Sequence, residues 1–178
     1  MADSPSAISL HNAFSFPPLV APSARVLVLG SMPGIASLNA SQYYAHPRNA
    51  FWPIMGELFG FSAGLPYTKR IQQLQARHVA VWDVLQSCVR HGSLDSAIER
   101  NTSVPNDLPG FLSEHVHIHH IFFNGSKAEE CFRRHFALKQ FPAALQLTRL
   151  PSTSPAHAGM SIATKLAAWR TVAIAASE

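Results

Sequence analysis

Residues 43–52 concentrate side chains that can take part in chemistry. The segment is Tyr43-Tyr44-Ala45-His46-Pro47-Arg48-Asn49-Ala50-Phe51-Trp52, which brings aromatic rings, an imidazole, a guanidinium and an amide together. An aromatic ring can stack on a flat ring of a ligand. The amide of Asn49 donates and accepts hydrogen bonds, but it is too weakly basic to take up a proton. Such a mixture rarely serves a hydrophobic core alone, so this segment is a candidate site.

A second polar segment lies far downstream and also follows an apolar run. It is Leu150-Pro151-Ser152-Thr153-Ser154-Pro155-Ala156, with three small hydroxyl side chains in a row between prolines. Hydroxyls and turn amides of this kind suit the oxygens of a phosphate group. The alternative is a loop that only leads into the last helix, but the composition favours a functional role.

The elements that must position these segments alternate between strand and helix. The apolar run at residues 25–30 predicts a buried parallel strand, and Ser31-Met32-Pro33-Gly34 then forces a sharp turn. Further strands are predicted at residues 79–83, 119–125 and 145–150. Helices are predicted at residues 50–59, 68–77, 93–101, 126–138 and 161–175, with a short one from Asn106 or Asp107 to Leu112.

Strands separated by helices of this length imply right-handed crossovers and a sheet covered on both faces. The sequence therefore predicts an α/β protein with one three-layer α/β/α domain around a central four-stranded, mainly parallel sheet. We expect this domain at residues 25–178, after an N-terminal arm at residues 1–24. Ligands of such sheets bind beyond the carboxyl ends of the strands, where Met32, Asp83, Asn124 and Ser152 are expected to gather.

The two polar segments resemble a known family. Residues 30–34 together with 44–52 resemble motif 1 of the uracil-DNA glycosylase superfamily, and most of all its mismatch-specific and hypoxanthine-specific branches. Residues 150–156 are similar to motif 2 of the superfamily, and to the hypoxanthine branch in particular. Both matches follow predicted strands in the expected order, and the resemblance extends over residues 25–170.

The resemblance implies a DNA base-excision repair enzyme that hydrolyses the N-glycosidic bond of deaminated bases, chiefly hypoxanthine and then uracil. The damaged base must leave the helix before water can attack the sugar, so the protein needs a pocket, a stacking surface and contacts to the DNA backbone. The implied partner is DNA containing deaminated bases, and no cofactor is implied. Alternatives are a uracil- or mismatch-specific glycosylase, or a non-catalytic relative that binds damaged DNA.

Catalysis is expected to depend on Asn49. Elsewhere in the superfamily the turn after the first strand usually carries Asp or Asn where this chain has Met32, which neither binds nor activates water. In the hypoxanthine branch the Asn of the His-Pro-X-Asn segment is the main catalytic candidate, and it corresponds to Asn49. Asn49 also stands where a cap for the helix from Ala50 is expected, and the two roles are compatible.

The resemblance also implies a set of residues that bind the flipped base. Tyr44 corresponds to the ring that stacks on the base, and the turn at Ser31 and Met32 offers backbone amides. Asp83 either accepts an N–H such as N1–H of hypoxanthine or holds the loop to Ser87. Asn124 either binds a carbonyl beside an N–H or is a turn residue.

Contacts to the DNA backbone are assigned to the second segment. Ser152, Thr153 and Ser154 are expected to bind phosphate, and residues 155–158 to fill the space that the base leaves. His157 stands where the branch has Asn, and we expect it to act as wedge or phosphate contact.

Composition sets further bounds. The net charge of +4 and the isoelectric point near 9.4 weakly favour a polyanionic partner. The chain has two cysteines, Cys88 and Cys131, and neither lies in a paired metal-binding motif, which excludes a structural zinc or iron-sulfur site of the usual kind. The histidines at positions 115, 117, 119 and 120 have no neighbouring carboxylate or Cys to complete a zinc site. We therefore expect no metal. We also expect a cytoplasmic monomer and no membrane span.

Because no Lys precedes Lys69, the first motif offers no amine for a Schiff base, so a monofunctional enzyme is expected.

Overall fold

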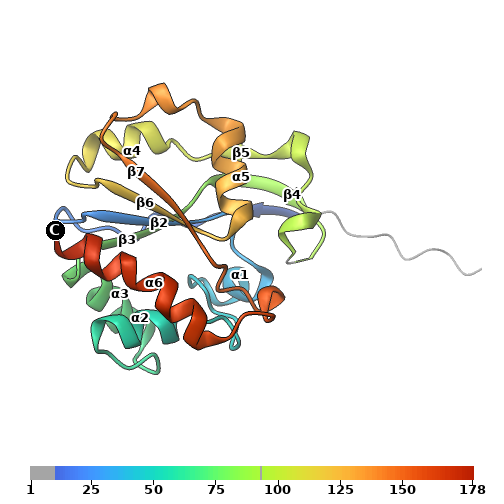
Figure 1. The fold of residues 1–178 in the computed structure, drawn as a ribbon. Coiled ribbons are helices and arrows are strands. Elements are labelled where there is room, and N and C mark those ends of the chain that lie inside the picture. Colours follow the sequence, from blue (N-terminus) through green and yellow to red (C-terminus); the bar gives the residue numbers. More distant parts are fainter. Residues whose placement is uncertain (1–10, 93) are drawn as a thin grey trace, which may run out of the picture.

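The computed structural model describes residues 11–92 and 94–178. A central sheet has the strand order β3 (Val79–Asp83), β2 (Val26–Gly30), β6 (His120–Asn124) and β7 (Gln146–Leu150). All neighbouring pairs in this sheet are parallel. The four predicted strands and their parallel arrangement are therefore confirmed (Figure 1).

Helices cover both faces of this sheet. One face carries α2 (Phe51–Phe59), α3 (Tyr67–Ala76) and α6 (Ile162–Ser177), and the other carries α4 (Leu108–Glu114) and α5 (Ser126–His135) (Figure 1). The side chains of β2 alternate between the two sides. Leu27 and Leu29 join the core with α4 and α5, whereas Val26 and Val28 join the core with α2 and α6. This alternation confirms the predicted three-layer architecture.

A second, antiparallel sheet was not expected from the sequence. It consists of β1 (His11–Phe14), β4 (Leu85–Arg90) and β5 (Val104–Pro105). β4 follows β3 after a single residue and leaves the central sheet (Figure 1). Within the expected N-terminal arm, β1 pairs with β4 and Leu19 forms a bridge with Val81, so residues 11–24 pack on the domain.

The predicted helix at residues 93–101 is wrong. The segment instead forms two 3-10 turns, η1 (Asp95–Ala97) and η2 (Arg100–Thr102), and its expected cap Ser93 lies outside the described residues. The reason is competition from β4: the Glu99 amide donates to the Val89 carbonyl, and the Val89 amide donates to the Thr102 hydroxyl. These bonds replace the i to i−4 bonds of an α-helix.

Three shorter elements lie between the main ones. α1 (Ile35–Ala40) follows the turn after β2, η3 (Leu138–Gln140) follows α5, and η4 (Pro155–His157) lies in the second polar segment. Figure 1 places α1 and η4 together beyond the carboxyl ends of β2, β6 and β7. The two polar segments found in the sequence thus flank the same edge of the sheet.

Candidate active site

The turn after β2 is held tightly by β4. The carbonyl of Gly30 accepts the Val84 amide at 2.9 Å, and the carbonyl of Ser31 accepts the Leu85 amide at 3.1 Å. The carbonyl of Pro33 accepts Nη2 of Arg90 at 2.5 Å. The Met32 side chain is buried in the core, so the turn can offer a ligand its backbone and not this side chain.

Gly30 allows a carboxylate and a phenol to converge above the end of β2. Gly30 lies opposite Asp83 in the sheet, and a Cβ at Gly30 would collide with Oδ1 of Asp83 and lie 3.3 Å from the Tyr44 hydroxyl. Asp83 is buried, and burial together with the nearby charge of Asp83 raises the pKa of Tyr43. Because the Val84 and Leu85 amides bind the turn, Asp83 does not cap those two amides of the loop that follows it.

Tyr44 is supported from behind by α2. Its ring stacks on Phe51, with ring centroids 4.0 Å apart and an angle of 29° between the planes. Tyr44 has φ 55°, a left-handed conformation that costs a non-glycine residue about 1 kcal/mol and persists only where neighbours fix it. The adjacent Ala45 amide is fixed by a bond to Ser37 Oγ at 3.1 Å. The half-buried Tyr44 ring is therefore preorganised.

Asn49 occupies the start of α2 with one end of its amide. Its Oδ1 accepts the Phe51 amide at 3.0 Å, and its backbone amide donates to the His46 carbonyl at 2.8 Å. The helix begins one residue later than expected, so Ala50 and not Asn49 is its N-cap residue, but the Asn49 side chain still binds the first amide of α2. Nδ2 of Asn49 has no hydrogen-bond partner among the described residues, so the cap leaves this donor for a ligand.

Thr153 joins the two polar segments. Its amide donates to Asn124 Oδ1 at 2.9 Å, and its hydroxyl accepts Asn124 Nδ2 at 2.8 Å. Its carbonyl accepts the Ala50 amide at 2.9 Å, next to Asn49. Thr153 is only 1% exposed, so its hydroxyl faces the protein interior. Asn124 uses both ends of its amide to fix the second segment, a pairing that no local sequence pattern indicates.

The remainder of the second segment lies closer to solvent. Ser152 Oγ accepts the Ser154 amide at 3.2 Å, and Ser154 Oγ accepts the Ala156 amide at 3.3 Å. Ser152 packs against Gly125, which has φ 93° and no room for a Cβ. His157 is exposed at the end of η4. These side chains therefore form the outer surface of the segment.

Two buried side chains that sequence reasoning missed support this segment from below. Nζ of Lys165, in α6, donates to the His157 carbonyl at 2.9 Å, and burial lowers the pKa of Lys165. The indole of Trp169 donates to the Pro151 carbonyl at 2.9 Å. A signal was available in the sequence, because Lys165 lies on the same helical face as Trp169 and Val172, but nothing local indicated which loop Lys165 and Trp169 bind.

Comparison with known proteins agrees with this geometry. The family model of the uracil DNA glycosylase superfamily matches residues 17–173. The chain belongs to the uracil DNA glycosylase superfamily. The resemblance and the fold expected from the sequence are both confirmed.

Individual relatives narrow the position within the superfamily. Two proteins named hypoxanthine DNA glycosylase, from Methanosarcina barkeri and Methanosarcina acetivorans, are 30% and 34% identical over 116 residues. Each alignment covers 65% of this chain and 72% of the relative. The solution NMR structure of a candidate uracil DNA glycosylase from M. acetivorans matches with a TM-score of 0.79 and 28% identity, covering 94% of this chain and 100% of the other. These comparisons support the predicted DNA glycosylase.

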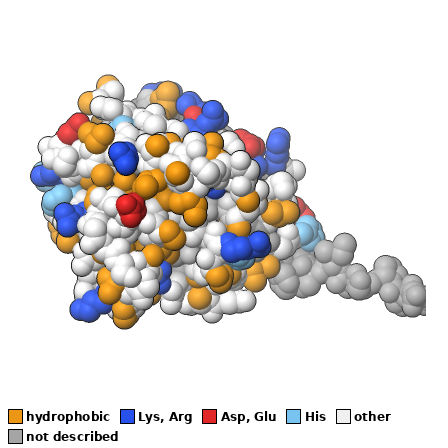
Figure 2. Space-filling model, turned by 60° about the horizontal axis from the view of Figure 1, so that its bottom comes forward, with side chains coloured by type: hydrophobic (Ala, Val, Ile, Leu, Met, Phe, Trp, Pro, Cys, Tyr) orange, Lys and Arg blue, Asp and Glu red, His pale blue; other side chains and the backbone are white. Residues whose placement is uncertain are grey.

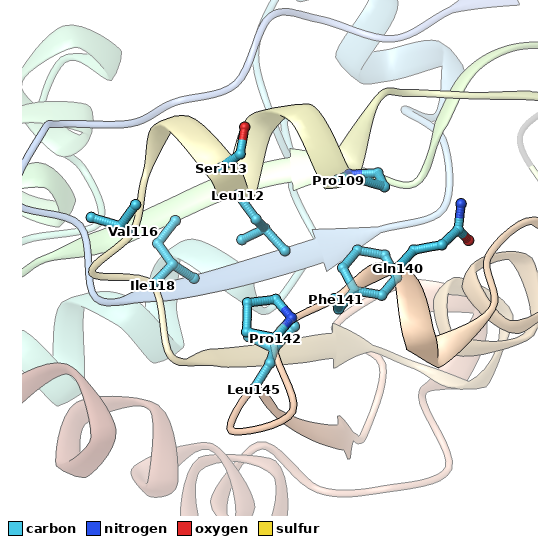
Figure 3. A pocket seen from close by; sticks show the side chains of 9 residues that line it. All are labelled: Pro109, Leu112, Ser113, Val116, Ile118, Gln140, Phe141, Pro142 and Leu145. Atoms are coloured by element: carbon cyan, nitrogen blue, oxygen red, sulfur yellow. The ribbon is translucent and has the colours of Figure 1, made fainter.

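Two cavities lie away from the segments that carry the superfamily resemblance. One of about 380 Å³ lies between α4 and the segment that enters β7, and its walls are mainly apolar (Figure 3). A second of about 410 Å³ is lined by Pro22, Ser23, Arg25, His78 and His117. Neither is lined by a residue that the sequence assigned to the site.

The histidine cluster does not have the extended geometry expected from the sequence. The Ile118 amide donates to the His115 carbonyl, so residues 115–118 form a turn. Nδ1 of His115 lies 2.8 Å from the Phe111 carbonyl, and Nε2 of His120 lies 2.8 Å from the Thr148 hydroxyl. Within residues 11–92 and 94–178, no three His, Cys, Asp or Glu side chains are grouped to hold a metal ion.

The chain has a net charge of +4, and the basic side chains do not gather into one patch on the face drawn in Figure 2. On the face covered by α2, α3 and α6, Lys and Arg side chains are spread among uncharged and hydrophobic ones (Figure 2). None of the helices in the described part of the chain has the length and apolar character needed to cross a membrane.

Proposed function

We propose that this member of the superfamily is a monofunctional glycosylase that releases hypoxanthine from DNA containing deoxyinosine. The observation that carries the proposal is the bond from the Ala50 amide to the Thr153 carbonyl. This bond links the residue after Asn49 to the second segment, which supports a site shared by the two segments. The names of the two Methanosarcina relatives support hypoxanthine as the base.

Binding begins with a base that has left the duplex. Tyr44, backed by Phe51, stacks on its flat face, and such stacking contributes about 1–3 kcal/mol without choosing among bases. Choice comes from hydrogen bonds: the buried carboxylate of Asp83 accepts N1–H of hypoxanthine, and the amides of the turn at Ser31 and Met32 donate to its acceptors.

Hydrolysis breaks the bond between the sugar carbon and the base, and the bonding electrons leave with the base. Water attacks the sugar carbon and loses a proton, and the base gains one. Asn49 Oδ1 has a second lone pair beside the one that accepts the Phe51 amide, and this lone pair orients the water. Nδ2 donates to the negative charge that develops as the base departs. Neither role requires Asn49 to act as a base.

Contacts to the DNA backbone come from the outer part of the second segment. Ser152 and Ser154 present hydroxyls near solvent, and exposed His157 enters the space that the base leaves. The buried Thr153 hydroxyl serves a different purpose, because it fixes the segment through Asn124. The groups named come from one chain, so a monomer suffices for the reaction.

Duplex oligonucleotides with one inosine, uracil or xanthine test the proposal. After incubation, alkaline cleavage reveals abasic sites. We expect product from the inosine duplex without added metal or nucleotide, and unchanged release in EDTA. A requirement for zinc would contradict the metal-free mechanism, and absence of any product would contradict the activity.

The same assay separates the main alternative, a uracil or mismatch enzyme. The matching NMR structure, described as a candidate uracil DNA glycosylase, favours this alternative. Faster release from uracil duplexes than from inosine duplexes would establish it. Tight binding of both duplexes with no product would instead indicate a non-catalytic relative.

A further inference from the structure

Arg90 is a buried cation directly behind the turn of the first motif. It ends β4 and is only 2% exposed. Nε donates to the Gly92 carbonyl at 2.8 Å, and Nη2 donates to the Pro33 carbonyl at 2.5 Å. Nη1 is buried and has no hydrogen-bond partner among the described side chains and backbone, and no carboxylate whose side chain is described forms an ion pair with Arg90; the side chain of Asp95 is not among them.

Such a residue is costly for the fold. A guanidinium stays charged in proteins, and a buried charge that lacks an opposite charge destabilises the folded state unless its donors are well used. The two neutral carbonyls accept from only some of the N–H groups of the guanidinium. The positions before Arg90 on β4 include buried Leu85 and Cys88, so an apolar side chain would fit the surroundings. The charge therefore calls for an explanation beyond packing.

The bond to Pro33 has a geometric consequence for the turn. In a trans peptide the C=O and the following N–H point in opposite directions. Because the Pro33 carbonyl points at Arg90, the Gly34 amide points away from it, toward the other side of the turn. The Ser31 carbonyl points at Leu85, so the Met32 amide is likewise directed away from β4. Arg90 and the start of β4 thus orient two successive backbone donors.

We infer that Arg90 is a positioning residue for base release, an inference that rests on the proposed glycosylase reaction. Through the Pro33 carbonyl it orients the Gly34 amide toward the departing base. Among the side chains that the structure describes, no carboxylate pairs with this charge behind the turn, so its field favours the negative charge that the leaving base develops. Lysine cannot reproduce this arrangement, because an ammonium lacks the planar fork that spans the two carbonyls.

The test compares Arg90→Met and Arg90→Lys with Arg25→Met as matched control. Arg25 also donates to a backbone carbonyl, that of Ala176, but it lies just before β2, at the end of that strand away from the turn. Single-turnover release of hypoxanthine and affinity for an abasic-mimic duplex are measured for each folded variant. We expect Arg90→Met to lower the single-turnover rate by about 10- to 100-fold, with affinity within a few fold, since misplacement of a positioned group acts mainly on the chemical step. Arg90→Lys should recover part of the rate, and Arg25→Met should resemble wild type.

Chemical rescue distinguishes charge and position from general loosening. In Arg90→Ala, millimolar guanidinium should restore part of the rate, whereas the same concentration of sodium or of urea should not. A folded Arg90→Met protein with the wild-type rate would overturn the inference. So would an equal loss of rate in Arg25→Met, because the effect would then not depend on the turn.

Amide hydrogen exchange tests whether Arg90 fixes the turn without depending on glycosylase activity. Peptides that cover residues 31–40 should exchange faster in Arg90→Lys than in wild type, while peptides from β6 and β7 should not change. If wild-type protein releases no base from any duplex, the proposed function fails, and this exchange alone decides whether Arg90 fixes the turn. Should Arg90→Met not fold, Arg90→Lys supplies both rate and exchange. Unchanged exchange at residues 31–40 in Arg90→Lys overturns the inference.

Discussion

The two loops at the carboxyl edge of the sheet are held in different ways. The turn after β2 is bound by the backbone of β4 and by Arg90, and its residues Ser31, Met32 and Pro33 are buried. The segment after β7 is held by side chains from other elements, Asn124 and Lys165, and its outer residues reach solvent. A backbone-bound turn suits the precise placement that chemistry requires, whereas an exposed loop suits contact with the DNA backbone.

The largest effect should come from Asn49, which belongs to the first region. Asn49→Ala should lower the single-turnover rate by about 100-fold or more, the scale for loss of a preorganised transition-state donor, with little change in DNA affinity. Asn49→Asp is the control, because it keeps an oxygen for the Phe51 amide but loses the Nδ2 donor. A rate close to wild type in both variants would reduce Asn49 to a helix cap.

Asn124 tests the support of the second region. Asn124→Ala leaves the buried Thr153 amide and hydroxyl without their partner, so we expect a loss of about 2–4 kcal/mol in the free energy of unfolding, measured with urea. Asn124→Asp retains an acceptor for both groups if the Thr153 hydroxyl becomes the donor, and should lose less. Equal losses would mean that packing, and not these two bonds, decides the stability of the segment.

DNA binding should separate the two regions by role. Tyr44→Ala should weaken binding mainly to damaged or abasic-mimic duplexes, by about 1–3 kcal/mol, because stacking exists only after the base has flipped. Ser152→Ala should weaken binding to damaged and undamaged duplexes alike, since phosphate contacts carry no sequence information. Fluorescence anisotropy on matched duplexes at one salt concentration measures both. If both variants lose affinity for undamaged DNA equally, the first segment does not bind the base while the second binds the backbone, and this assignment is contradicted.

The smallest expected effect is a pH dependence of the support that Lys165 gives to the second segment. Burial lowers the pKa of Lys165 below its ordinary 10.5. Between the lowered pKa and 10.5 the unfolded chain holds the proton more strongly, so the contribution of Lys165 to the free energy of unfolding rises with pH across that window. Urea unfolding at several pH values should show this rise in wild type relative to Lys165→Met. Parallel curves for the two proteins would contradict it.

Local patterns predicted the central sheet well. The apolar runs that became β2, β3, β6 and β7 are short and end in Gly, Asp, Asn or Pro, so both their type and their order were visible. The second sheet was missed, because β4 begins one residue after β3 and mixes polar with apolar side chains without a separating turn signal. The helix predicted at residues 93–101 failed for a related reason. Its apolar spacing was helical, but the Glu99 amide donates to β4 and the Thr102 hydroxyl accepts from β4.

The sequence by itself determined the fold class, the superfamily and the two segments that carry the candidate site, because these follow from residue types in local patterns. Tertiary structure decided how the groups are used. It buried Thr153 against Asn124, gave one end of the Asn49 amide to α2 and brought Arg90 behind Pro33. Each of these contacts, apart from the cap, joins residues far apart in the chain. A hydrogen-bond partner across such a distance is chosen by the packing of whole elements, which no single segment encodes.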